Sequence, residues 1–169
     1  PYPGGPHIDA LAKQGNSEAI DFPRPLLEKG NFDFSFSGLK SAVLNYINGK
    51  QQKGESICHE DVAASFQKAI TDVLVEKMKE AAHTLGETKI ALAGGVSANS
   101  GLQRDLQVMC EAEGLTYLTA GSMLATDNAA MIGCRAYYMA QAGKFSNYTL
   151  NAKPSIPLGS DLWKGNQHD

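Results

Sequence analysis

A short apolar strand that runs directly into a glycine-rich turn is the feature that most constrains the fold of this chain. Residues 89–93 read Lys-Ile-Ala-Leu-Ala without polar alternation, which is typical of a strand covered on both faces in a parallel sheet. Gly94, Gly95 and a helix predicted over 98–112 follow, and then a second strand predicted over 115–119. Strand, helix and strand within about thirty residues form a βαβ unit, which predicts parallel strands joined by a right-handed crossover.

Apolar spacing predicts helices over much of the remaining chain. The longest runs from His59 to Leu85, where an apolar stripe recurs at helical spacing and Gly86 provides the stop. Residues 31–36 alternate phenylalanine with polar residues, which favours a short half-buried strand whose rings belong to the core. Residues 48–57 are predicted to form a polar loop. Shorter helices are predicted over 7–13, 39–47 and 123–142, with an irregular tail from 144.

The amino-acid composition limits the classes of protein to which this chain can belong. The chain has 169 residues, of which 43% are hydrophobic and 20% charged, as in a soluble globular domain. Its formal net charge of −3 excludes nucleic-acid binding driven by a global basic field. No apolar run is long enough to span a bilayer, so no membrane partner is expected. The chain opens on Pro1 rather than Met, and we expect it to be a fragment.

The segments that follow the two predicted strands should meet. Parallel strands end at one edge of a sheet, where ligands of open α/β folds bind, so residues 94–99 and 120–128 are expected to converge there. Gly94 lets the backbone approach a ligand closely, and the start of the next helix favours a phosphate. Ser97 or Asn99 can add side-chain hydrogen bonds. The pattern indicates one wall of a nucleotide- or phosphate-binding site.

Asp127 lies in the second of these segments, near the start of the last predicted helix. A carboxylate facing an anion-binding loop favours a cation between the two, so phosphate, metal and carboxylate form a coherent set. Simpler interpretations exist for both segments. The glycine turn with Asn99 is also an ordinary helix cap, and Asp127 is also a good partner for a helix dipole without any metal. The residues alone leave these alternatives open.

A set of short motifs, taken in chain order, narrows the choice. They are Tyr2–Pro6, Phe22–Pro25, Phe34–Lys40, Ala64–Gln67, Ala93–Asn99 and Ala125–Gly133. Together they resemble the tRNA N6-adenosine threonylcarbamoyltransferase family, once described as an O-sialoglycoprotein endopeptidase. The resemblance covers nearly the whole chain and weakens after about Pro157. It implies the C-terminal portion of such a protein, an α/β chain forming part of one lobe of the actin, sugar-kinase and Hsp70 fold (ribonuclease H-like), rich in helix around a small parallel βαβ core.

The resemblance implies an activity and site residues. Family members transfer a threonylcarbamoyl group from threonylcarbamoyl-adenylate to N6 of the adenosine next to the tRNA anticodon. On the matching positions, Gly5, Asp9 and Asn99 correspond to substrate or nucleotide contacts, and Asp127 corresponds to a metal ligand. The implied cofactor is one divalent metal per intact subunit, iron with zinc as the alternative. The implied partners are the adenylate, tRNA, a homologous dimerisation subunit and an accessory ATPase, in the cytoplasm or, in a eukaryote, the mitochondrion.

One departure from the family pattern limits what the chain can do by itself. The family's other metal ligands come from an H-x-x-x-H motif in the N-terminal lobe, and that spacing is absent here. We therefore expect half an active site and an inactive isolated chain, with no catalytic residue identified. The expected organisation is a substrate loop and helical insert over 1–57, an α/β core over 58–143 and an irregular tail over 144–169. The rival interpretations are a non-catalytic scaffold or dimerisation homologue and another nucleotide-binding enzyme of the superfamily, such as a sugar kinase.

Overall fold

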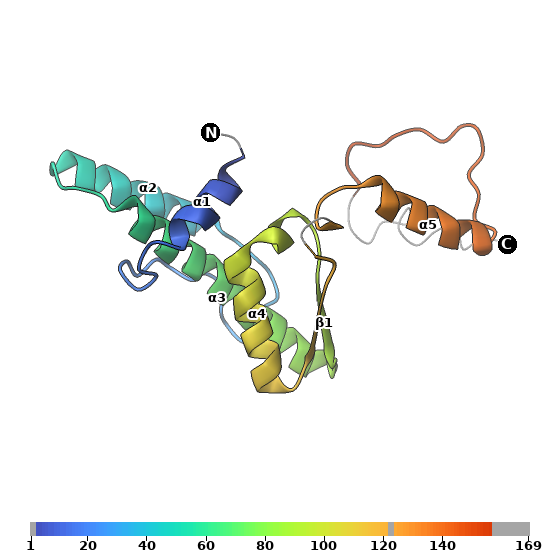
Figure 1. Ribbon diagram of the computed structural model, residues 1–169, viewed down its shortest axis with the longest axis horizontal. Coiled ribbons are helices and arrows are strands. Elements are labelled where there is room, and N and C mark those ends of the chain that lie inside the picture. The colour runs from blue at the N-terminus through green and yellow to red at the C-terminus, as the bar shows by residue number, and fades with distance from the viewer. Residues whose placement is uncertain (1–2, 122–123, 157–169) are drawn as a thin grey trace. The chain divides into compact units, whose positions relative to one another are not determined.

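The computed structural model describes residues 3–121 and 124–156 (Figure 1). They fall into two compact units, one that ends at Asp127 and one that begins at Asn128. The segment boundaries expected after residues 57 and 143 stay predictions. No helix in the described ranges is long and apolar enough to cross a membrane.

A long helix, α3, is the centre of the first unit. It spans His59–Leu85, as predicted, with Glu60 and Asp61 in its first turn, where carboxylates favour the positive end of the helix dipole. It ends at Gly86, whose φ of 67° places it in the left-handed region that glycine adopts without strain. Three shorter helices pack against α3: α1 (Gly4–Ala12), α2 (Ser37–Gln52) and α4 (Ser100–Glu113) (Figure 1).

Two parallel strands confirm the predicted βαβ unit. Strand β1 (Lys89–Leu92) pairs with β2 (Thr116–Thr119) so that Leu92 lies opposite Thr119. Between them the chain forms a 3-10 turn, η1 (Gly95–Ala98), and then α4. The model is thus helix-rich α/β with a small parallel sheet, as expected.

The expectation that β1 is covered on both faces is wrong for the described residues. Ile90 is buried and packs with α3 and α4, whereas Lys89 and Ala91 are exposed. Leu118 of β2 is also 48% exposed. The cause is that, among the described residues of the first unit, the helices cover one face of the sheet only. An unbroken apolar run therefore indicates that both faces of a strand are apolar enough to be buried. It does not show that a second layer of helices covers the other face.

Two apolar clusters hold the first unit together. One joins α3, β1 and α4, and includes the residues Leu102, Leu106 and Met109 that the sequence places on the inner side of the second helix of the βαβ unit. The other joins α2 to the start of α3 through Leu39 and Val62, with Phe22 from the preceding loop. The clusters fix α3 relative to α4 and α2.

The strand predicted over residues 31–36 is wrong, because this segment is irregular. Phe32 and Phe34 are 42% and 51% exposed rather than in the core, and only Phe36 packs against the second cluster. The Asn31 side chain accepts a hydrogen bond from the Asp33 amide at 2.9 Å, a local turn that competes with strand pairing. The loop predicted from residue 48 is also wrong at its start, since α2 continues to Gln52.

The second unit consists of helix α5 (Ala129–Gln141) and an extended segment. The helix begins later than the predicted residue 123, because Asn128 caps it by accepting the Met131 amide at 3.0 Å. Residues 144–156 contain neither helix nor strand, as predicted for this part of the tail. The rest of the predicted tail lies outside the described residues.

Candidate functional site at the junction of three helices

The turn after β1 is tighter than the sequence predicts. Gly94 has φ 89°, a conformation that favours glycine. The Ser97 amide donates to the Gly94 carbonyl at 2.9 Å, and the Asn99 amide donates to the Val96 carbonyl at 3.0 Å. These two amides are therefore used within the turn. The Ser97 side chain, one of the two candidates for a ligand contact, is only 2% exposed, so it contributes to the core instead.

Asn99 uses both ends of its side-chain amide. Its Oδ1 accepts the Leu102 amide at 2.8 Å, which makes it the cap of α4. Its Nδ2 donates to Gln67 Oε1 of α3, also at 2.8 Å. The simpler interpretation, a turn plus helix cap, is thus correct for the local geometry. The capped asparagine is also held against α3, which fixes the direction of its side chain.

Asp9 ties α1 to the start of α4. The Ser100 hydroxyl lies 2.9 Å and 3.0 Å from the two carboxylate oxygens of Asp9, and Lys13 Nζ lies 3.3 Å away. Burial alone would raise the pKa of Asp9, but hydrogen bonds from Ser100, Lys13 and Gln67 and the charge of Lys13 lower it below its ordinary value. The carboxylate is therefore ionised at neutral pH and accepts hydrogen bonds from donors near it.

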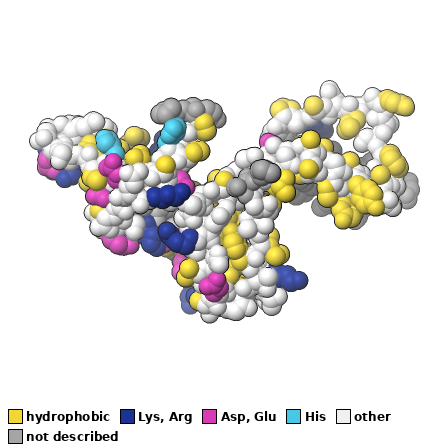
Figure 2. Space-filling model, in the orientation of Figure 1, with side chains coloured by type: hydrophobic (Ala, Val, Ile, Leu, Met, Phe, Trp, Pro, Cys, Tyr) yellow, Lys and Arg dark blue, Asp and Glu magenta, His cyan; other side chains and the backbone are white. Residues whose placement is uncertain are grey.

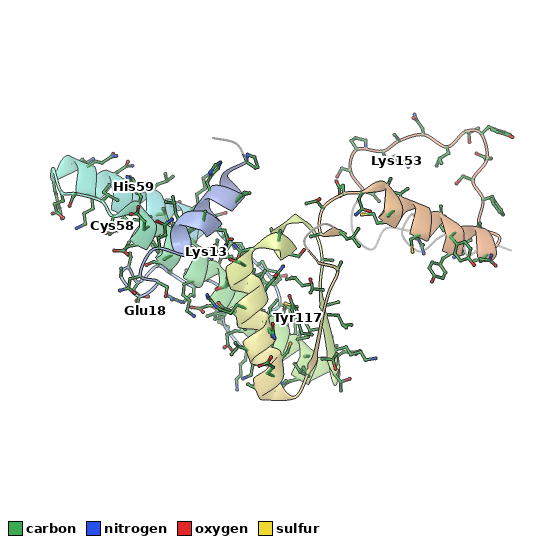
Figure 3. All side chains as sticks on the ribbon, in the orientation of Figure 1. Lys13, Glu18, Cys58, His59, Tyr117 and Lys153 are labelled. Carbon is green, nitrogen blue, oxygen red and sulfur yellow. The ribbon has the colours of Figure 1, made fainter. Side chains whose placement is uncertain are left out.

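Gly5 and Asn99 line the same small pocket, although they lie far apart in the sequence. The pocket has a volume of about 130 Å³, and most of its lining is apolar, including Phe66 and Leu102. Gln67 supplies a polar group at its edge. This volume is smaller than that of a complete ligand pocket, which is roughly 300–1,000 Å³. The pocket can therefore form only one side of a nucleotide site. Lys13, labelled in Figure 3, follows α1 at this junction.

The structure thus brings three predicted residues together. Gly5 and Asn99 share the pocket, and Asp9 is hydrogen-bonded to Ser100, which follows Asn99. We call this place, where α1, α3 and α4 meet, the three-helix junction. Its two polar anchors, Asp9 and Asn99, are each held by at least one further side chain.

Asp127 is exposed and is not part of the three-helix junction. In the described ranges no hydrogen bond or ion pair joins it to Asp9 or Asn99, and no group of three His, Cys, Asp or Glu side chains could hold a metal. The register of Leu92 with Thr119 does bring the two post-strand segments out at one edge of the sheet. A single exposed carboxylate does not fit a complete metal site, since such sites need about three or more protein ligands.

Sequence reasoning missed the side chains that hold the junction. Gln67 reaches Asn99, and a Cβ on Gly101 would lie 2.5 Å from Gln67 Nε2, so glycine leaves room for this contact. Ser100 anchors Asp9. Gln67 belongs to the motif Ala64–Gln67, but the motif carries no information about the partner. The one feature of the sequence that points to Gln67 is its place as a polar residue beside the apolar stripe of α3.

Comparisons with known proteins identify the family of this chain. The model of the tRNA N6-adenosine threonylcarbamoyltransferase family matches residues 1–134. Among curated relatives of that name, one from Clostridioides difficile strain 630 is 52% identical over 157 residues, which are 93% of this chain and 46% of the relative. A relative from Moorella thermoacetica is 51% identical over 158 residues, which are 94% of this chain and 46% of the relative.

The chain therefore spans a little under half the length of the curated relatives it matches. The motifs, the parallel βαβ unit and the match over most of the chain all agree. This chain belongs to the tRNA N6-adenosine threonylcarbamoyltransferase family.

Proposed function

We propose that this chain supplies one wall of the adenylate site in a tRNA N6-adenosine threonylcarbamoyltransferase. The reaction would move a threonylcarbamoyl group from threonylcarbamoyl-adenylate to N6 of the adenosine next to the tRNA anticodon. The observation that carries the proposal is the three-helix junction, where Gly5, Asp9 and Asn99 gather from distant parts of the sequence. The fold is proposed to be part of one lobe of the actin and sugar-kinase superfamily.

The junction offers the contacts that an adenylate needs. The apolar lining around Phe66 suits the face of an adenine ring, which stacks on aromatic and aliphatic surfaces. Asp9, kept ionised by its neighbours, accepts hydrogen bonds from ribose hydroxyls. The amide of Asn99 is oriented by Gln67 and the α4 backbone, so it meets a ligand without losing much side-chain entropy.

Asp127 is proposed as one ligand of a divalent metal, iron with zinc as the alternative. The described residues do not complete such a site, so the remaining ligands would come from the part of the family's length that this chain does not match. The further proposed partners are tRNA, a homologous dimerisation subunit and an accessory ATPase, and the proposed location is the cytoplasm. Family membership supports these proposals.

A chimera tests the proposed function. This chain replaces the matching segment of the Clostridioides difficile relative, whose remaining sequence supplies the other part of the site. We expect the purified chimera to form threonylcarbamoyladenosine on an unmodified tRNA when given threonylcarbamoyl-adenylate, detected by mass spectrometry of tRNA nucleosides. A folded, soluble chimera that makes no product, while the unaltered relative does, would contradict the proposal and favour a non-catalytic scaffold.

The same chimera tests the role of Asp127. Asp127→Ala should lower both bound metal, measured by elemental analysis, and product formation. Asp33→Ala is the matched control, because Asp33 is also an exposed carboxylate of the first unit. Unchanged metal content in Asp127→Ala would contradict the ligand assignment even if activity fell.

A further inference from the structure

We propose that a polar cavity beside the three-helix junction binds a backbone phosphate of the tRNA. This inference rests on the proposed function and adds the surface on which the second substrate lies. The cavity has a volume of about 280 Å³ and is lined by the end of α1, the loop after it, α3 and α4. We call it the basic cavity because three cationic side chains line it: Lys13, Lys68 and Arg104.

The side chains that line the basic cavity carry a net positive charge, whereas the chain as a whole is acidic. The lining contains these three cations and one carboxylate, Asp105, whereas the whole chain carries a net charge of −3. Figure 2 shows lysine and arginine side chains gathered between α1 and α4 on the face turned to the viewer. The cations come from separate elements, so the fold and not a basic run in the sequence collects them.

Each cation has a carboxylate partner that lies deeper in the protein than the cation does. Lys13 pairs with Asp9, and the exposed fractions of the two side chains are 59% and 15%. Lys68 pairs with Asp72 (34% and 24%). Arg104 pairs with Asp105 at 2.9 Å (70% and 22%). The carboxylates thus contact the charged heads of the cations directly, and each cationic side chain is also partly open to solvent.

The carboxylates also accept hydrogen bonds from donors other than these cations. Asp72 accepts from Arg24 Nε at 2.9 Å, and Asp105 accepts from the Thr71 hydroxyl at 2.9 Å. Asp9 accepts from Ser100. A lysine ammonium has three N–H donors and a guanidinium has five, so one ion pair does not exhaust either group. A phosphate entering the cavity would find unused N–H groups already positioned.

The lining favours a phosphate over a base or an apolar ligand. No aromatic ring is among the described residues that line the basic cavity, so it offers no stacking platform. Three hydroxyls line it beside the cations; those of Thr71 and Ser100 already donate to Asp105 and Asp9, and that of Ser17 is the further donor the lining offers. Protein contacts to nucleic-acid backbones come mainly from such cationic and hydroxyl groups.

The position of the basic cavity, next to the apolar pocket, suits the second substrate of the proposed reaction. Gln67 and Thr71 line both this cavity and the apolar pocket at the three-helix junction, so the two are neighbours separated by side chains of α3. An acceptor nucleotide placed next to the adenylate would bring its flanking backbone within reach. Arg104, at 70% side-chain exposure, also faces solvent, as a contact to a large polyanion requires.

The salt dependence of tRNA binding tests the proposal. Binding of an unmodified tRNA to the 169-residue chain is measured between about 50 and 200 mM salt. Lys68→Gln and Arg104→Gln should each weaken binding on the order of tenfold and lower the slope of log affinity against log salt by about one. Lys53→Gln, which removes an exposed lysine at the end of α2, is the matched control and should leave the slope unchanged. Circular dichroism verifies that each variant is folded.

The possible outcomes distinguish a failure of the phosphate-binding proposal from a failure of the proposed transferase function. In the chimera, Arg104→Gln should raise KM for tRNA and leave KM for the adenylate unchanged. Slopes equal to that of the unaltered chain, or a loss of affinity for adenosine monophosphate or inorganic phosphate but not for tRNA, would overturn the inference. A reduced slope together with an inactive chimera would instead contradict only the proposed function.

Discussion

The helices that follow the two strands begin in the same way and differ in what they bury. Helix α4 starts after Asn99, which caps the Leu102 amide at 2.8 Å, and α5 starts after Asn128, which caps the Met131 amide at 3.0 Å. In α4 several side chains are buried, and Leu106 has no exposed surface. In α5 no side chain is buried among the described residues.

This difference separates two contributions to a helix. A cap accepts hydrogen bonds from free backbone amides and sets where a helix begins. Both asparagines therefore stabilise the first turn of their helix in the same way. Burial requires a second surface, which α4 finds on α3 and on one face of the sheet. In α5, Ile132 and Tyr137 are 65% and 61% exposed. Most of the stability of a helix in a protein comes from such packing, so equal caps should give unequal responses to substitution.

The largest contrast is expected from truncating apolar side chains. Leu106→Ala should lower the free energy of unfolding by about 2–5 kcal/mol, because it leaves a cavity in the core between α4 and α3. Ile132→Ala in α5 should change it by no more than about 0.5 kcal/mol. Urea denaturation of the 169-residue chain measures both. Equal losses would show that α5 is buried against another part of the chain.

The two caps provide the next contrast. Asn128→Ala should cost about 1 kcal/mol, the usual effect of a lost cap. Asn99→Ala should cost about 2 kcal/mol, because it also leaves Gln67 without its 2.8 Å partner. Hydrogen exchange at the first turns of α4 and α5 reports each local effect separately. An Asn99 variant no less stable than the Asn128 variant would remove the Gln67 contact from the explanation.

A smaller contrast concerns a glycine in each helix. Gly133→Ala in α5 should stabilise the helix by roughly 0.5–1 kcal/mol, because nothing lies within 4 Å of the added Cβ. Gly101→Ala in α4 should gain nothing, because its Cβ would lie 2.5 Å from Gln67 Nε2 and displace that side chain from Asn99. Helical content and thermal stability measured by circular dichroism distinguish the two. A stabilised Gly101 variant would show that Gln67 moves without cost.

The smallest effect is expected from pH. Hydrogen bonds to Asp9 keep its pKa in the folded protein below the ordinary value of 3.8. Its contribution to stability is therefore present above that value and is lost as the pH falls through the lowered pKa. Asp9→Asn should flatten the decline of the melting temperature below about pH 4. An unaltered decline in this variant would mean that the contact of Asp9 with Ser100 is not stabilising.

Short sequence patterns correctly predicted the elements whose structure depends on residues close together in the chain. The apolar stripe and Gly86 gave both ends of α3, and the unbroken strand followed by a helix gave the parallel pair. Family resemblance assigned Gly5, Asp9 and Asn99 to substrate or nucleotide contacts; that assignment stays a prediction, and the structure places the three residues at one junction. In each case the determining contacts are short-range or recur in a recognisable motif.

The predictions that were wrong or missed depend on contacts between residues that are far apart in the sequence or on the absence of a pairing partner. The alternating segment 31–36 has no strand to pair with, so a local Asn31 turn prevails. The exposed face of β1 depends on which layers pack against it, and not on its own residues. Gln67 gives no sign in the sequence that it reaches Asn99, because that contact depends on how α3 crosses the start of α4.

The variant Asn99→Asp in the chimera tests most directly whether the three-helix junction binds the adenylate. Aspartate is as good a helix cap as asparagine, so α4 should stay intact, but the amide N–H groups are lost. We expect KM for threonylcarbamoyl-adenylate to rise on the order of tenfold, since a lost hydrogen bond to a charged or polar ligand costs about 1.4 kcal/mol or more. The melting temperature should fall less than in Asn99→Ala, because the cap is kept and only the contact with Gln67 is lost, and KM for tRNA should not change. An unchanged KM for the adenylate would contradict the assignment of the junction as its binding wall.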